Sequence, residues 1–237
     1  MQKSALSKFG TPITVLSIVF LSLLVACEQP GGSTGKDIAG QTTYATALRE
    51  LRPLAEQGHA KSQYKLGIMY RDGRGVPQDY AEAVKWYRKA AVQGFASAQV
   101  ALGFMYRKGR GVPQDYAETA KWYRRAAEHG HAKAQLNLGT MYRLGRGVPQ
   151  DYAETAKWYR RAADQGHAMA QNNLGVMYRD GWEVPQDYVR AHMWCSLSAA
   201  QGHKKAAKLC DAVAKSMTSA QIAEAQRMVR EWKPKKE

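Results

Sequence analysis

The sequence predicts an all-α protein, a right-handed solenoid of about five 36-residue αα-hairpins with a C-terminal capping helix. Residues 109–127 recur without a change at 145–163, and tyrosine, glycine and tryptophan return at intervals of 36. Within each interval the apolar residues are spaced as on amphipathic helices. A single αα-hairpin cannot bury its apolar stripe alone, so neighbouring units must stack.

The periodic residues mark the parts of each unit. In the unit that starts at residue 96, the first helix is expected at 96–108, with Ala98, Leu102 and Met105 on one stripe. The same step of 36 relates Tyr44, Tyr80, Tyr116, Tyr152 and Tyr188, then Gly58, Gly94, Gly130, Gly166 and Gly202, then Trp86, Trp122, Trp158 and Trp194.

The turn and the second helix follow from local signals. Gly109 is placed where a left-handed C-terminal cap is expected, and Pro113 prevents the first helix from continuing. Asp115 then suits the N-cap of the second helix, with Glu118 three residues later as in a capping box. The second helix carries its alanines and a Trp-Tyr pair on one side and lysine and arginine on the other.

These units resemble the Sel-one-like repeat, a relative of the tetratricopeptide repeat. The shared motifs are Leu-Gly-x-x-Tyr in the first helix, Gly-x-Gly-Val in the turn, Trp-Tyr-x-x-Ala-Ala in the second helix and the glycine after it. The resemblance implies an adaptor that assembles protein complexes, with no enzymatic activity and no cofactor.

The N-terminal segment is expected to be a lipoprotein signal peptide, residues 1–26. Two lysines precede an apolar run at 11–24, which is too short to span a membrane. Leu24-Val25-Ala26-Cys27 resembles the bacterial lipobox, which implies lipidation of Cys27 after cleavage. Glu28 in place of Asp favours the outer membrane, facing the periplasm. An uncleaved signal anchor or an ordinary secretory signal is the alternative.

Three segments are expected in the mature chain. Residues 27–43, rich in Gly, Ser and Thr, predict a flexible tether. Residues 44–210 hold the repeat solenoid, and residues 211–237 hold the C-terminal capping helix, an amphipathic stretch at 217–232, and a tail. The chain is therefore expected in the cell envelope, anchored to a membrane by lipid and not spanning it.

The chain is basic, with a formal net charge of +15. Arg74, Arg110 and Arg146 recur in the turns as part of the unit, so a solvated basic face explains much of this charge. Attraction to anionic envelope polymers is the second interpretation. Export removes most nucleic acid from reach, so no nucleic-acid partner is expected.

Two patterns could carry chemistry. Ser62 and Lys65 form a Ser-x-x-Lys pair, as in serine β-lactamases, but the partner motifs are missing and Ser62 aligns with alanines of the other units. Four histidines, one per unit, follow the inter-helix glycine (His59, His131, His167 and His203). Equivalent positions of stacked units lie about 10 Å apart, so no metal site and no catalytic residue are predicted.

Cys195 and Cys210 lie at similar heights on two helices expected to be antiparallel. An oxidising compartment would permit a disulfide. Two buried free thiols, in place of the tyrosine and leucine of other units, are equally compatible with the sequence.

Comparison of the units within the chain separates fixed positions from changing ones. The changing positions of the first helices fall mostly on one helical face, which predicts a groove for a protein or peptide partner. The alternative is a surface under no constraint. The predicted partner-binding residues are Tyr64, Lys65, Ile68, Phe104, Asn137, Thr140, Asn173 and Val176.

The sequence thus favours a non-enzymatic interaction scaffold in the bacterial cell envelope. An envelope hydrolase or β-lactam-binding enzyme, and a binder of anionic cell-wall polymer, are the alternatives.

Overall fold

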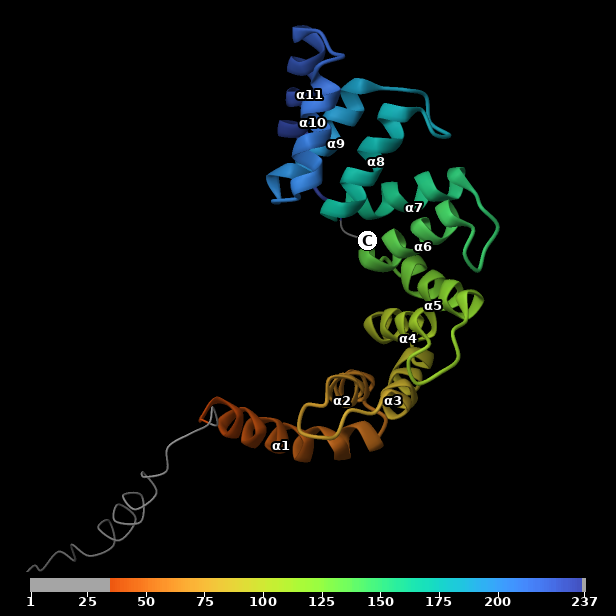
Figure 1. Ribbon diagram of the computed structural model, residues 1–237, viewed down its shortest axis with the longest axis vertical. Helices are drawn as coiled ribbons and strands as arrows, with labels where there is room; N and C mark the ends of the chain where they lie inside the picture. Colours follow the sequence, from red (N-terminus) through yellow and green to blue (C-terminus); the bar gives the residue numbers. More distant parts are fainter. Residues whose placement is uncertain (1–34, 236–237) are drawn as a thin grey trace, which may run out of the picture. The chain divides into compact units, whose positions relative to one another are not determined.

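The computed structural model describes residues 35–235, with side chains from residue 44 onward, and this range holds helices and no strand (Figure 1). Residues 1–40 and 41–237 form two units, and the second carries the repeats. The helices are α1 (Gly35–Glu56), α2 (Ala60–Asp72), α3 (Tyr80–Val92), α4 (Ala96–Lys108), α5 (Tyr116–Glu128), α6 (Ala132–Leu144), α7 (Tyr152–Asp164), α8 (Ala168–Asp180), α9 (Tyr188–Ala200), α10 (Lys204–Ala214) and α11 (Ser219–Glu231).

Four complete αα-hairpins follow one another, which confirms the predicted all-α repeat fold. They pair α2 with α3, α4 with α5, α6 with α7 and α8 with α9, and we number them repeats 1 to 4. Each second helix also packs against the first helix of the next repeat (Figure 1). Helix α1 ends one incomplete repeat and α10 begins another, so both ends of the stack are half units.

The N-terminal predictions fall largely outside this range. The signal peptide and Cys27 lie outside the described residues, as does the first part of the 27–43 tether. Residues 35–43 of that segment belong to α1. No helix of the described residues is long and apolar enough to cross a membrane.

Each second helix is capped by an aspartate. The carboxylate of Asp115 accepts a hydrogen bond of 2.9 Å from the backbone N–H of Glu118. The reciprocal half of the expected capping box is absent in this repeat, because the Glu118 carboxylate accepts from Trp122 Nε1 at 3.1 Å and from Lys121 Nζ at 2.7 Å. Gly109 adopts the expected left-handed conformation, with φ of +62°.

Within a hairpin, a glycine of the first helix packs against a tyrosine of the second. A Cβ added to Gly103 would lie 2.7 Å from the Tyr123 ring, so only glycine lets the two helices approach this closely. Tyr87, Tyr123 and Tyr159, the equivalent residues of repeats 1 to 3, are fully buried. In repeat 4 the residue equivalent to these tyrosines is Cys195, and Leu209 of α10 lies beside the equivalent glycine, Gly175.

Between repeats, each turn rests on the start of the preceding second helix. A Cβ added to Gly111, whose φ is +71°, would lie 2.2 Å from the backbone oxygen of Tyr80. The guanidinium of Arg110 lies 5.2 Å from the centre of the Tyr80 ring. In repeat 4 the aromatic ring of Trp182 takes the place of arginine, 6.1 Å from the Tyr152 ring.

A ladder of buried glutamines also joins the repeats. Gln99 of α4 donates a hydrogen bond of 3.1 Å to the backbone oxygen of Ala91 in α3. Gln93 donates a hydrogen bond of 2.7 Å to Gln63 Oε1. In the same way, Gln165 donates to Gln135 Oε1 and Gln201 donates to Gln171 Oε1. His129 occupies the equivalent place in repeat 2, which leaves Gln99 Oε1 without a partner.

The C-terminal end is closed by α10 and α11. Cys195 of α9 and Cys210 of α10 form a disulfide, with a Cα–Cα distance of 5.6 Å. Helix α11 packs on α9 and begins with a capping box between Thr218 and Gln221. The final amphipathic helix expected at 217–232 is thus observed at Ser219–Glu231.

Substitution of two glycines tests how much the contact between a turn and the preceding repeat contributes to stability. We expect Gly111→Ala to lower the free energy of unfolding by about 3 kcal/mol, since it adds a clash with Tyr80 to the strain of a positive φ. Gly94→Ala, with φ of +85° and open space around its Cβ, should cost about 1 kcal/mol. Urea unfolding followed by circular dichroism measures both; equal losses would show that the contact with Tyr80 is unimportant.

Candidate functional site

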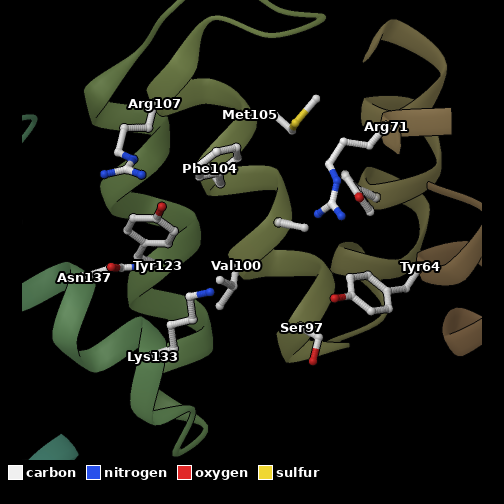
Figure 2. Close-up of a pocket in the computed structure, with 12 residues that line it drawn as sticks. Tyr64, Arg71, Ser97, Val100, Phe104, Met105, Arg107, Tyr123, Lys133 and Asn137 are labelled. Atoms are coloured by element: carbon white, nitrogen blue, oxygen red, sulfur yellow. The ribbon is translucent and has the colours of Figure 1, made fainter. Parts of the chain in front are cut away.

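The side of α2, α4, α6 and α8 that carries the eight predicted partner-binding residues is called the variable face. Four cavities are lined by residues on this side; one of them, of about 480 Å³, lies between the end of α2 and α4 and is lined by Asp72, Arg74 and Phe104 among others. The α4 cavity, of about 350 Å³, lies between α2 and α6 and is lined by Tyr64, Val100, Phe104, Arg107 and Lys133 among others (Figure 2). The α6 cavity, of about 50 Å³, and the α8 cavity, of about 180 Å³, follow in the next two repeats.

Six of the eight predicted residues line these cavities. Tyr64, Phe104 and Asn137 line the α4 cavity, Asn137 and Thr140 line the α6 cavity, and Asn173 and Val176 line the α8 cavity. Lys65 is exposed and Ile68 is half-buried in the core around α3 and α4, and neither lines a cavity of the variable face. Binding by any of the eight stays a prediction.

Tyr64 has a packing role as well. Its ring lies 5.8 Å from that of Tyr87 and 5.3 Å from that of Phe95. Phe104 is also half-buried against the core around α3 and α4, and the guanidinium of Arg107 lies 5.3 Å from the centre of its ring. Because Phe104 forms no aromatic pair within residues 44–235, it is the more suitable of the two positions for probing binding.

An arginine recurs near the end of each first helix, at positions 71, 107, 143 and 179. In repeat 1, the Arg71 guanidinium donates two hydrogen bonds to Asp72, at 2.6 and 2.9 Å, and these bonds lower the pKa of the Asp72 carboxyl. Arg179 and Asp180 repeat this pair in repeat 4.

The two central repeats lack the acidic neighbour. Lys108 follows Arg107 and Leu144 follows Arg143. Across the part of the chain with described side chains, neither arginine forms a salt bridge. The Nε atom of Arg107 is buried and makes no hydrogen bond. The charge of these two arginines is therefore not neutralised.

Buried tyrosines form the floor beneath the arginines. The hydroxyl of Tyr87, a residue with 0% exposure that lines the α4 cavity, has no hydrogen-bond partner. Burial raises the pKa of Tyr87 and of Tyr123, so both hydroxyls stay protonated and can donate. The hydroxyl of Tyr159, by contrast, lies 3.0 Å from Thr140 Oγ1.

The described residues show no group of three or more metal-ligating side chains. Ser62 is buried at the position that Ala98, Ala134 and Ala170 occupy in the other repeats, each with 0% exposure. Its surroundings are those of a packing residue, and no histidine or lysine hydrogen-bonds to it in residues 44–235.

The four recurring histidines lie at helix N-caps. They precede α2, α6, α8 and α10. His131 Nδ1 accepts a hydrogen bond of 3.4 Å from the backbone N–H of Ala134. Burial lowers the pKa of His131 and of His167, which favours the neutral ring that can accept such a bond.

Sequence reasoning missed the residues that give the site its charge. Arg107 and Arg143 look like framework because arginine stands at that position in every repeat. The available signal was the next residue, which is Asp, Lys, Leu and Asp in the four repeats. Reading the two positions together would have shown which arginines lack a partner.

The recurring αα-hairpins define a helical repeat protein. The model of the Sel1 repeat matches residues 60–95, 96–131, 132–167 and 168–203, which coincide with repeats 1 to 4. The chain belongs to the Sel1 repeat family, whose members typically serve as protein-interaction scaffolds.

Two solved structures illustrate the likeness. A Sel1 repeat protein from Oxalobacter formigenes is 34% identical, with a TM-score of 0.69, over 83% of this chain and 80% of that one. The protective antigen c5321 of uropathogenic Escherichia coli, which displays an SLR fold, is 45% identical with a TM-score of 0.66. That match covers 67% of this chain and 34% of c5321, so this chain accounts for about a third of its length. No curated protein matches the chain significantly.

The buried histidine caps predict a pH effect. Because folding lowers the pKa of His131 and His167, the unfolded chain binds more protons near their ordinary pKa of 6.5. Stability should therefore fall as the pH drops below 6.5 toward the folded pKa, above the range where carboxylates titrate. Urea midpoints between pH 7.5 and about 5.5 measure this.

A variant with His131→Asn and His167→Asn should flatten that dependence, because asparagine also suits an N-cap and does not titrate. An unchanged slope in this variant would assign the effect to other groups, of which His192, also lowered in pKa by burial, is the first to examine.

Proposed function

We propose that the protein is a non-enzymatic scaffold that binds a protein partner through the variable face. One observation carries this proposal. In repeats 1 to 3 the second helices and turns are closely similar, whereas the first helices differ from one another on the face that contains the α4, α6 and α8 cavities. Such a division is typical of helical repeat proteins, in which a constant framework presents changing side chains to a ligand.

Attraction to anionic envelope polymers through the outer side of the second helices has weaker support. Lys121 and Lys157 each form an ion pair of 2.7 Å with a glutamate three residues earlier, and Lys85 pairs with Glu82. Arg125 and Arg161 lie over the rings of Trp122 and Trp158. Much of the basic charge on that side is thus already compensated.

The proposed site of action is the bacterial cell envelope. Support comes from the sequence before the repeats: an apolar run at 11–24 that ends in Leu24-Val25-Ala26-Cys27. A lipid on Cys27 would hold the repeats at a membrane surface, and Glu28 favours the outer membrane, facing the periplasm.

Site-specific photocrosslinking tests the binding face. A photoreactive amino acid placed at Phe104 or Val176 in intact cells should give an adduct with a protein partner, which mass spectrometry identifies. The same amino acid at Lys121 or Lys157, on the outer side of α5 and α7, should give none of that adduct. Phe104→Ala should weaken the complex by about 1–3 kcal/mol. Equal crosslinking from both sides would contradict the proposal.

The anchor has a separate test. Cys27→Ala should leave an uncleaved precursor and abolish incorporation of labelled palmitate, because lipidation of the cysteine precedes cleavage. The mobility of the variant on a denaturing gel and the radiolabel report the two events. Normal processing of the variant, together with an unlabelled wild type, would exclude a lipid anchor.

A further inference from the structure

We infer that the segment bound by the variable face is an acidic peptide with interspersed apolar residues, and that its carboxylates contact Arg107 and Arg143. This inference rests on the proposed function and specifies the chemistry of the partner.

The charge of the α4, α6 and α8 cavities is one-sided, whereas the cavity between the end of α2 and α4 contains Asp72. No acidic residue lines the α4, α6 or α8 cavity, whereas Arg107 and Lys133 line the first, Arg107 and Arg146 the second, and Arg143 the third. A guanidinium offers a planar fork of donors that matches a carboxylate in two-bond geometry. The central repeats therefore form a strip that is suited to anionic groups.

The ends of this strip are neutralised from within the chain. Asp72 and Asp180 each hold the arginine that precedes them in a bidentate ion pair. A central arginine without such a partner keeps its donors free for a ligand. In repeat 2 the aspartate position is Lys108, which adds a second positive charge beside Arg107.

Two unpartnered donors in the α4 cavity are an independent observation. The Tyr87 hydroxyl is fully buried and has no hydrogen-bond partner. The Nε atom of Arg107 is also buried and also has no hydrogen-bond partner. A buried polar group without a partner costs free energy, about 1–3 kcal/mol. A carboxylate in this cavity would lie close to two donors for which residues 44–235 provide no acceptor; because both atoms are closed to solvent, its direct hydrogen bonds would go to the other N–H groups of Arg107.

The walls of the cavities favour a peptide over a free anion or a nucleic acid. Phe104 lies beside Arg107 in the α4 cavity and Val100 lies nearer Lys133 (Figure 2), and Val176 lines the α8 cavity with Arg143. Apolar side chains adjacent to cations suit a segment that alternates acidic and apolar residues. A second copy of this chain is a poor candidate, because two chains with a formal net charge of +15 repel each other.

The test uses the full chain purified in detergent micelles and a short fluorescein-labelled peptide in which glutamate alternates with leucine. Binding is followed by fluorescence polarisation, and a matched peptide with glutamine in place of glutamate serves as the uncharged probe. We expect the glutamate peptide to bind, with an affinity that falls as salt is added, and the glutamine peptide to bind at least about tenfold more weakly.

The decisive variant combines Lys108→Asp with Leu144→Asp, which gives the central repeats the Arg-Asp pairs of repeats 1 and 4. It should weaken binding of the glutamate peptide by about tenfold or more. Lys208→Asp with Ala212→Asp changes the net charge by the same amount at exposed positions of α10 and should leave binding unchanged. Circular dichroism and thermal unfolding confirm that both variants fold.

Several outcomes would overturn the inference: no binding of the glutamate peptide, equal binding of the glutamine peptide, wild-type affinity in the Lys108→Asp/Leu144→Asp variant, or equally tight binding of a single-stranded oligonucleotide that competes for the site. Crosslinks from Phe104 to a protein would then still support the scaffold. Absence of those crosslinks, by contrast, would remove the proposed function itself.

Discussion

The rest of the structure depends on one contact, in which each turn packs against the start of the second helix of the preceding repeat. Gly111 leaves no room for a side chain against the backbone oxygen of Tyr80, and Arg110 covers the ring of the same tyrosine. Since a repeat contacts only its neighbours, this contact sets the register that the next repeat inherits. The α4, α6 and α8 cavities follow one another along the first helices, and in repeat 4 the turn carries Glu183, with φ of +50°, in place of the glycine.

In repeats 1 to 3 the second helix changes less than the first, whereas the second helix of repeat 4 differs from the others at most positions. The second helix packs against the first helix of its own repeat and of the next, so Tyr123 and Ala126 are almost wholly buried. First helices pack against two second helices in the same way, so the buried side of either helix tolerates little change of shape. The first helix keeps Leu102 and Gly103 for packing, while residues such as Phe104 lie partly open. Variation at these open positions costs little stability and can specify a ligand.

The fold could be predicted well from the sequence because tyrosine, glycine and tryptophan recur every 36 residues, and these residues make the contacts that define the hairpin. It predicted less where a contact depends on a neighbour in space. Glu118 has a capping-box position, yet Trp122 Nε1 and Lys121 take its carboxylate. The Oε1 atom of Gln99 lacks a donor because the glutamine that supplies it in the other repeats, thirty positions later, is replaced by His129. Six of the eight predicted site residues line cavities. Arg107 and Arg143 were not predicted as site residues, because an arginine that recurs in every repeat indicates a role in packing.

The position of the unpaired arginines gives their charge more weight than the net charge of the chain suggests. Exposed lysines such as Lys121 are paired on the helix surface, where an ion pair contributes little and salt screens it. Arg107 is partly enclosed by Phe104 and the tyrosine floor, where the surroundings screen less and a missing acceptor matters more. On the inferred binding of an acidic segment, Asp72 and Asp180 at the two ends, with no aspartate at the equivalent positions between them, would direct that segment to the central repeats. The same framework could select other segments through changes at the residue that follows each arginine.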